Sequence, residues 1–106
     1  MINARQELIS ALAQADKVYP ADVIAFNILI EDCHDGSLHS CKGTTLTPDA
    51  LEKLDVVYDN GFGSQHLFGY VLFNDNTWLS RYEYDGSEWW EYNHPPTVEE
   101  VLNFGA

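Results

Sequence analysis

The first fifteen positions of the chain repeat apolar residues at helical spacing. They follow the i, i+4, i+7, i+8, i+11 pattern of an amphipathic helix: Ala4, Leu8, Ala11, Leu12 and Ala15. This pattern predicts a helix over residues 2–15. We expect the helix to end before Pro20, because a proline disfavours helical geometry in the residue that precedes it.

Residues 23–31 are β-branched or apolar and alternate as in a strand. The fully apolar face, which we expect to point toward the core, is formed by Ile24, Phe26, Ile28 and Ile30. Asp35 and Gly36 then supply a turn, and residues 38–45 are expected to return as a weaker partner strand.

Two further helices are indicated by their starting residues. Thr47 has the place of an N-cap and Pro48 that of the first helical position, which predicts a short helix over 48–54. Thr97 and Glu100 have the spacing of a capping box, which predicts a last helix over 97–103.

Residues 66–93 contain three aromatic-rich runs, separated by the turn formers at 74–76 and 85–87. They predict an antiparallel meander. With two-residue loops at 75–76 and 85–86, Phe73 lies opposite Trp78, Val71 opposite Ser80, and Gly69 opposite Tyr82, which in turn faces Trp89. We expect one face of this meander to be buried, with the side chains of Val71, Phe73, Tyr82 and Trp89.

The same register gathers a second set of large side chains on the other face: Phe68, Tyr70, Leu72, Leu79, Trp90 and Tyr92, with Arg81, Glu83 and Glu88. A small antiparallel sheet usually leaves one face polar, so this second apolar face needs a cover. The cover is either the N-terminal segment or a partner. The chain is therefore expected to form one α+β domain over 1–106, with an antiparallel sheet (66–93 plus 23–31) and three short helices packed on it.

Charge narrows the classes of partner. Seventeen Asp and Glu against five Lys and Arg give a formal net charge of −12. Such a surface repels nucleic acid and anionic membranes and attracts basic proteins. No run of about 20 apolar residues and no export signal is visible, so we expect a cytoplasmic protein without a membrane partner.

Candidate chemistry is sparse. Four zinc-ligand types lie close together at Cys33, His34, His39 and Cys41, but their spacing is unlike that of structural zinc knuckles, so we expect reduced cysteines and no metal. Ser64 with His66, and Glu83 with Glu88 across a hairpin, are incomplete as catalytic arrangements. We expect no cofactor and no enzymatic activity.

The second half of the chain resembles a group of small proteins. The resemblance is carried by residues 75–79, 81–90 and Pro95–Pro96, and covers about residues 66–96. These resemble the C-terminal part of small acidic proteins of unassigned function encoded by phages, prophages and plasmids. The resemblance implies an origin in a mobile element and carries no activity or site residues.

The first functional hypothesis is a non-enzymatic binding protein of inhibitor, immunity or DNA-mimic type. It would dock a basic partner such as a nuclease or DNA-binding protein, or a second copy of the chain, through aromatic side chains flanked by carboxylates. The candidate residues are Phe68, Tyr70, Trp90, Tyr92, Glu83, Glu88, Glu99 and Glu100. The alternatives are a structural or adaptor protein whose acidity serves solubility, and a small enzyme.

Overall fold

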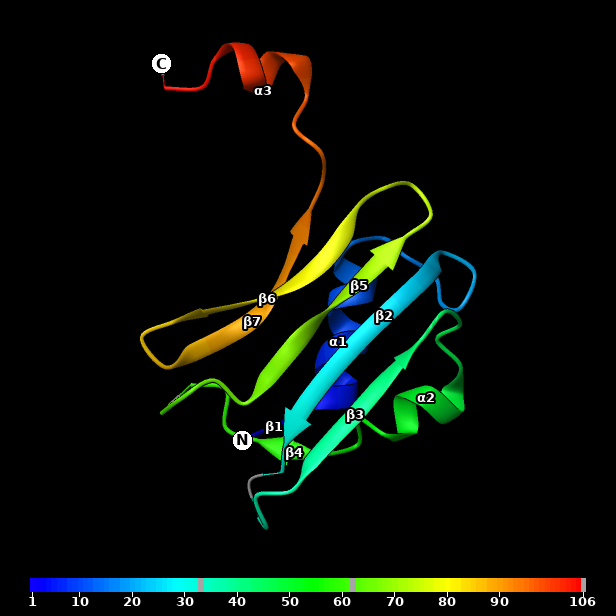
Figure 1. The fold of residues 1–106 in the computed structure, drawn as a ribbon, viewed down its shortest axis with the longest axis vertical. Helices are drawn as coiled ribbons and strands as arrows, with labels where there is room; N and C mark the ends of the chain where they lie inside the picture. The colour runs from blue at the N-terminus through cyan, green and yellow to red at the C-terminus, as the bar shows by residue number, and fades with distance from the viewer. Residues whose placement is uncertain (33, 62, 106) are drawn as a thin grey trace.

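The computed structural model describes residues 1–32, 34–61 and 63–105. Its five-stranded antiparallel sheet has the order β3-β2-β5-β6-β7, and a two-stranded sheet pairs β1 with β4 (Figure 1). The strands are β1 (Ile2–Asn3), β2 (Val23–Glu31), β3 (Leu38–Gly43), β4 (Val57–Tyr58), β5 (Leu67–Phe73), β6 (Trp78–Tyr84) and β7 (Ser87–Asn93). The helices are α1 (Ala4–Gln14), α2 (Pro48–Glu52) and α3 (Val98–Leu102). The predicted α+β class with an antiparallel sheet is confirmed.

The local signals in the sequence explain the helix starts. Asn3 caps α1 by accepting a hydrogen bond from the backbone N–H of Gln6 at 3.1 Å, so the helix begins two residues later than predicted. Thr47 caps α2, and Thr97 and Glu100 form the predicted capping box of α3. Residues before α1 instead pair with β4, which the sequence did not indicate.

The core lies between α1 and one face of the large sheet, with α1 behind the sheet in Figure 1. Leu8 and Leu12 of α1 are buried against the inward side chains of the central strands, among them Ile28, Val71 and Phe73. Each fully buried Leu or Ile contributes about 1.5–3 kcal/mol relative to an exposed one. We call this the inner face of the sheet, and the opposite face the outer face.

One residue of β2 departs from its predicted alternation. The pairing of β2 with β5 shifts between Val23 and Ala25, which indicates a bulge. As a result Val23 is buried and Ile24 is exposed, whereas Phe26, Ile28 and Ile30 point into the core as expected.

The third helix does not pack on the sheet, contrary to our expectation. No residue of α3 is buried, and the helix stands away from the rest of the molecule beyond the end of β7 (Figure 1). Its apolar side chains at Val98, Val101 and Leu102 are exposed. The capping box is thus sufficient for a helix start, but it says nothing of a packing surface.

Candidate protein-binding surface

The loop between β5 and β6 decides which side chains share a face. It contains three residues, because the backbone N–H of Phe73 donates to the carbonyl of Thr77 at 2.9 Å. Asn76 adopts a positive φ of 69°, and the Asp75 side chain accepts a hydrogen bond from Thr77 N at 3.1 Å. Leu72 therefore lies opposite Trp78, and the register predicted from a two-residue loop is wrong by one residue.

That one-residue slip moves side chains between the faces. Val71 and Phe73 are buried as predicted, but Tyr82 and Trp89 are exposed, and their predicted burial is wrong. The predicted contact of Gly69 with Tyr82 is also absent from the register, in which Gly69 lies opposite Ile28 of β2.

The predicted aromatic surface is consequently divided between the two faces. Phe68 and Tyr70 lie on the outer face and are exposed. Tyr92 lies opposite Leu79, which is buried opposite Val71, so Tyr92 belongs to the inner face. Trp90 also lies on the inner face, opposite Arg81, and packs partly against the core. The expectation that these four aromatic residues form one surface is therefore wrong.

The flanking carboxylates are divided as well. Glu83 is exposed and lies opposite Glu88, as predicted, but Glu88 is only 2% exposed. Its expected place on an exposed rim is wrong, because its carboxylate is bound within the molecule. Glu99 and Glu100 are exposed on α3, away from the sheet.

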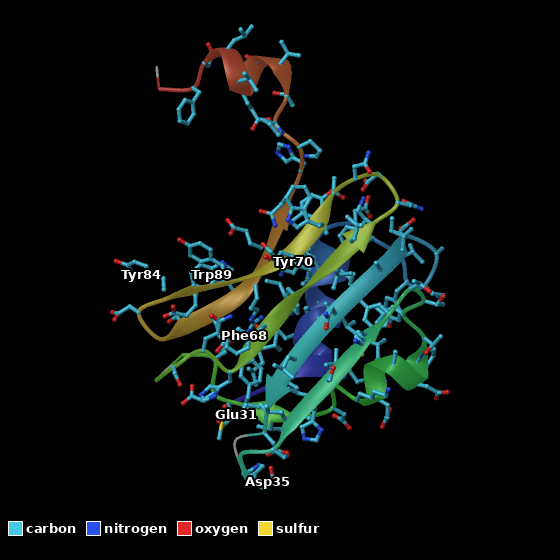
Figure 2. The ribbon with its side chains drawn as sticks, in the orientation of Figure 1. Glu31, Asp35, Phe68, Tyr70, Tyr84 and Trp89 are labelled. Atoms are coloured by element: carbon cyan, nitrogen blue, oxygen red, sulfur yellow. The ribbon has the colours of Figure 1, made fainter. Side chains whose placement is uncertain are left out.

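The outer face carries an aromatic patch, which we define by its exposed side chains on β5, β6 and β7: Phe68, Tyr70, Leu72, Tyr82, Tyr84 and Trp89. Figure 2 shows four of them, with Phe68 and Tyr70 on β5 and Tyr84 and Trp89 on the β6–β7 hairpin. Tyr82 and Trp89 are cross-strand partners whose ring centroids are 5.0 Å apart. Within the described ranges, no helix lies over this face.

The exposed area of this aromatic patch is comparable with that of the largest apolar patch on a typical monomer. Exposed fractions run from 38% at Leu72 to 70% at Tyr84. With 150–250 Å² for each aromatic side chain, about half exposed, the patch presents roughly 500 Å² of mainly apolar surface. The largest apolar patch on a typical monomer is about 300–600 Å² and is often functional. Two shallow hollows, of about 320 and 170 Å³, lie on either side of Tyr70 between β2 and β5.

Charges border the aromatic patch. Glu91 lies on the outer face, in the same cross-strand row as Ser80 and Tyr70. Glu31 lies at the end of β2 on this face, and Lys42 of β3 lies at its other edge. Figure 2 shows Glu31 and Asp35 below Phe68. The patch is thus apolar at its centre, with charged residues at its edges.

A buried polar cluster lies behind the patch, centred on Arg81. Its side chain is 1% exposed and reaches Glu7 of α1 at 3.1 Å and Glu88 of β7 at 3.0 Å. Arg81 also donates to the hydroxyl of Tyr58 on β4, and that hydroxyl donates to Glu7. Burial, followed by the hydrogen bond to Glu7, raises the pKa of Tyr58 far above its usual range, so the phenol stays neutral.

Glu88 ties this cluster to the backbone. Its carboxylate accepts hydrogen bonds from the N–H of His66 at 2.7 Å and of Leu67 at 3.0 Å, where β5 begins. Its own N–H donates to the carbonyl of Asn60 at 2.8 Å. This cluster was not predicted from the sequence. The available signal was Arg81 on the same face of the strand as the apolar Leu79, because an arginine that is buried requires a counter-charge.

A recess of about 150 Å³ opens beside the cluster, between α1 and the edge strand β7. It is lined by one face of α1 and by the two adjacent tryptophans: Glu7, Ser10, Ala11, Gln14, Trp89 and Trp90. The indole N–H of Trp90 is buried, and no described residue accepts a hydrogen bond from it. The guanidinium of Arg81 lies 5.3 Å from the Trp90 ring centroid.

Three of the four zinc-ligand residues, His34, His39 and Cys41, lie in the described part of the chain, where they form no metal-ligand group. Cys41 is buried, its thiol donates to the carbonyl of Ala50 at 3.1 Å, and burial raises the pKa of that thiol. His39 lies outside the core, 3.7 Å from Asp32, and His34 is exposed. Cys33 lies outside the described residues. Among those described, no three His, Cys, Asp or Glu side chains are grouped as metal ligands.

The catalytic arrangements weighed from the sequence stay incomplete. His66 lies 3.9 Å from Glu31 through Nδ1, and Ser64 is exposed in the preceding loop. Glu88 is bound to Arg81, so Glu83 and Glu88 face each other across the hairpin without forming an open carboxylate pair.

Comparisons with known proteins give no family to which the chain can be assigned. No protein-family model matches it, and neither a curated protein nor a solved structure shows significant similarity. The resemblance to small proteins of mobile elements therefore stays a prediction. Within the described residues, none of the helices has the length and apolar character needed to cross a bilayer.

Proposed function

We propose that the protein is a non-enzymatic binding protein that docks a basic protein partner through the aromatic patch of its outer sheet face. The observation that carries this proposal is the uncovered centre of the sheet, where Phe68 and Tyr70 are 46% and 63% exposed. Aromatic side chains are enriched at the centres of protein interfaces, where they supply large contact areas at low entropic cost.

The charge of the chain selects the kind of partner. Two of the five cationic side chains, Lys17 and Arg81, are already engaged by carboxylates, whereas most of the seventeen acidic residues lie on the surface. A chain of charge −12 accelerates its encounter with a basic protein and repels nucleic acid. Nucleases and DNA-binding proteins carry such basic surfaces, which agrees with a role as an inhibitor, immunity or DNA-mimic factor of a mobile element.

Binding should be measured against a panel of purified basic nucleases and DNA-binding proteins at low and at high salt. We expect at least one to bind, to lose affinity as salt rises, and to lose it by about tenfold or more with Tyr70→Ser or Phe68→Ser. Phe104→Ser is the matched control, because Phe104 is 93% exposed but lies beyond α3, outside the aromatic patch.

Three results would contradict the proposal. Binding that is unchanged by the Phe68 and Tyr70 substitutions would place the interface elsewhere. Association of the chain with itself, strengthened by salt because like charges are screened, would replace the basic partner by a second copy. No binding to any basic protein, with full stability and monomeric behaviour, would favour an adaptor or structural role in which acidity only maintains solubility.

A further inference from the structure

The recess between α1 and β7 carries a surplus of negative charge. Glu7 and Glu88 share one guanidinium, that of Arg81, and Tyr58 stays neutral. The cluster as a whole therefore carries one uncompensated negative charge. Glu88 is enclosed, whereas Glu7 lines the recess with its side chain 12% exposed. A cation in the recess would meet this charge where water screens it less than at an open surface.

Trp90, whose side chain lies on the inner face with α1, forms the other side of the recess, whereas Trp89 also lines it but has its ring on the outer face against that of Tyr82. Indole rings are the best aromatic partners of cations, and a planar guanidinium stacks on them better than a compact ammonium does. The lining therefore matches a side chain that ends in a guanidinium.

The volume of the recess fits a single side chain but not a larger ligand. Its volume of about 150 Å³ equals about five water molecules. Pockets for drug-sized ligands and cofactors are about 300–1,000 Å³, so a nucleotide or coenzyme does not fit. The head of an arginine side chain and its last methylene groups are of the right size.

We propose that this recess receives an arginine side chain of the protein partner, with Glu7 as its counter-charge and the Trp90 indole as its aromatic wall. This assignment rests on the proposed function and specifies the chemistry of the partner. Trp89 belongs both to the aromatic patch and to the recess. A partner lying on the outer face can therefore extend one arginine around the edge of β7 without a second interface.

The test uses a small probe, so it does not depend on identifying the partner. N-acetyl-arginine N-methylamide is titrated into the ¹⁵N-labelled protein, and the indole N–H signals of Trp89 and Trp90 are followed by NMR. The citrulline analogue is the matched neutral probe, because it has nearly the same shape and no charge. We expect saturable shifts with the arginine probe and an affinity for the citrulline probe lower by about tenfold or more.

Two variants show where the probe binds. Ser10→Leu fills the recess without touching the Arg81 cluster and should abolish the indole shifts. Gln6→Leu is the control, since Gln6 is exposed on α1 but does not line the recess. Equal binding of the citrulline analogue, no shift with the arginine probe, or an unchanged response in Ser10→Leu would each overturn the assignment. Failure here would leave the Phe68 and Tyr70 experiment intact, so the two proposals can fail separately.

Discussion

Replacing Glu88 by glutamine should destabilise the fold strongly, although the two side chains have nearly the same shape. The Glu88 carboxylate is fully buried, and its two oxygens accept hydrogen bonds from His66 N, Leu67 N and the Arg81 guanidinium. A glutamine retains one of the two oxygens. Its NH₂ group replaces the other oxygen and faces a buried N–H donor or the guanidinium, so two donors meet and no hydrogen bond forms.

The magnitude follows from these contacts. A buried donor left without an acceptor costs about 1–3 kcal/mol, and hydrogen bonds to a charged group contribute more than those to a neutral one. Breaking a buried ion pair costs about 3–5 kcal/mol, but here Glu7 still compensates Arg81, so we expect a loss of about 2–4 kcal/mol. For a domain of this size, that lowers the melting temperature by roughly 10–20 °C.

Urea denaturation followed by circular dichroism measures this loss, with an expected midpoint lowered by about 2 M for a slope near 1.5 kcal/mol/M. Glu83→Gln is the matched control: Glu83 lies opposite Glu88 in the same hairpin, is exposed, and should change stability by no more than about 0.5 kcal/mol. A Glu88→Gln protein within about 1 kcal/mol of the parent would refute the reasoning, as would equal losses in both variants.

Three further predictions concern stability. Gly69→Ala should lower the free energy of unfolding, measured by urea denaturation, by about 2–4 kcal/mol, because φ at Gly69 is +146° and an added Cβ atom would lie 2.3 Å from the carbonyl oxygen of Asn27. Gly43→Ala is the control and should cost less than about 1 kcal/mol, because its added Cβ atom would meet only the ring of Phe26. Hydrogen bonds from Lys17 and Thr77 hold the pKa of Asp75 well below its usual range, so its contribution is present at neutral pH and is lost as pH falls below about 4. Urea midpoints from pH 7 to pH 2 should therefore fall less steeply for Asp75→Asn, and parallel curves would contradict this. Truncation before Thr97 should leave the unfolding free energy unchanged within about 0.5 kcal/mol, because α3 buries no residue; a larger loss in calorimetry would show that α3 packs on the sheet.

The features of the fold that were predicted correctly are mostly those decided by interactions between residues close together in the sequence. The bounds of β2, the N-caps at Thr47 and Thr97 and the register of the β6–β7 hairpin depend on neighbouring residues, and all were predicted. The β5–β6 loop is also local, but Asn74–Asp75–Asn76 is compatible with both two and three loop residues. Choosing the shorter loop reversed the expected exposure of Tyr82 and Trp89.

The candidate site depended more on distant contacts. Phe68 and Tyr70 were predicted to share one face of the meander, with its cover left open between the N-terminal segment and a partner, but the exclusion of Trp90 and Glu88 from that face was not predicted. Glu88 is buried because Arg81 of β6, the backbone at the start of β5 and that of Asn60 meet it, and no periodicity along one strand reports such a meeting. Whether a helix covers a sheet face also depends on packing between distant segments, as the uncovered outer face and the unpacked α3 show.

The short pairing between β5 and β6 has a consequence for how the molecule opens. These strands are paired over only three positions, Tyr70 to Leu72, whereas β6 and β7 are paired over seven. On the side of β5 that faces β6, the backbone at the start of β5 donates hydrogen bonds to the carboxylate of Glu88 in place of hydrogen bonds to the backbone of β6. Hydrogen exchange at the amides of His66 and Leu67 therefore reports on one side chain. Through its ion pair with Arg81, that side chain couples the opening of β5 to α1 and β4 in a single cooperative unit.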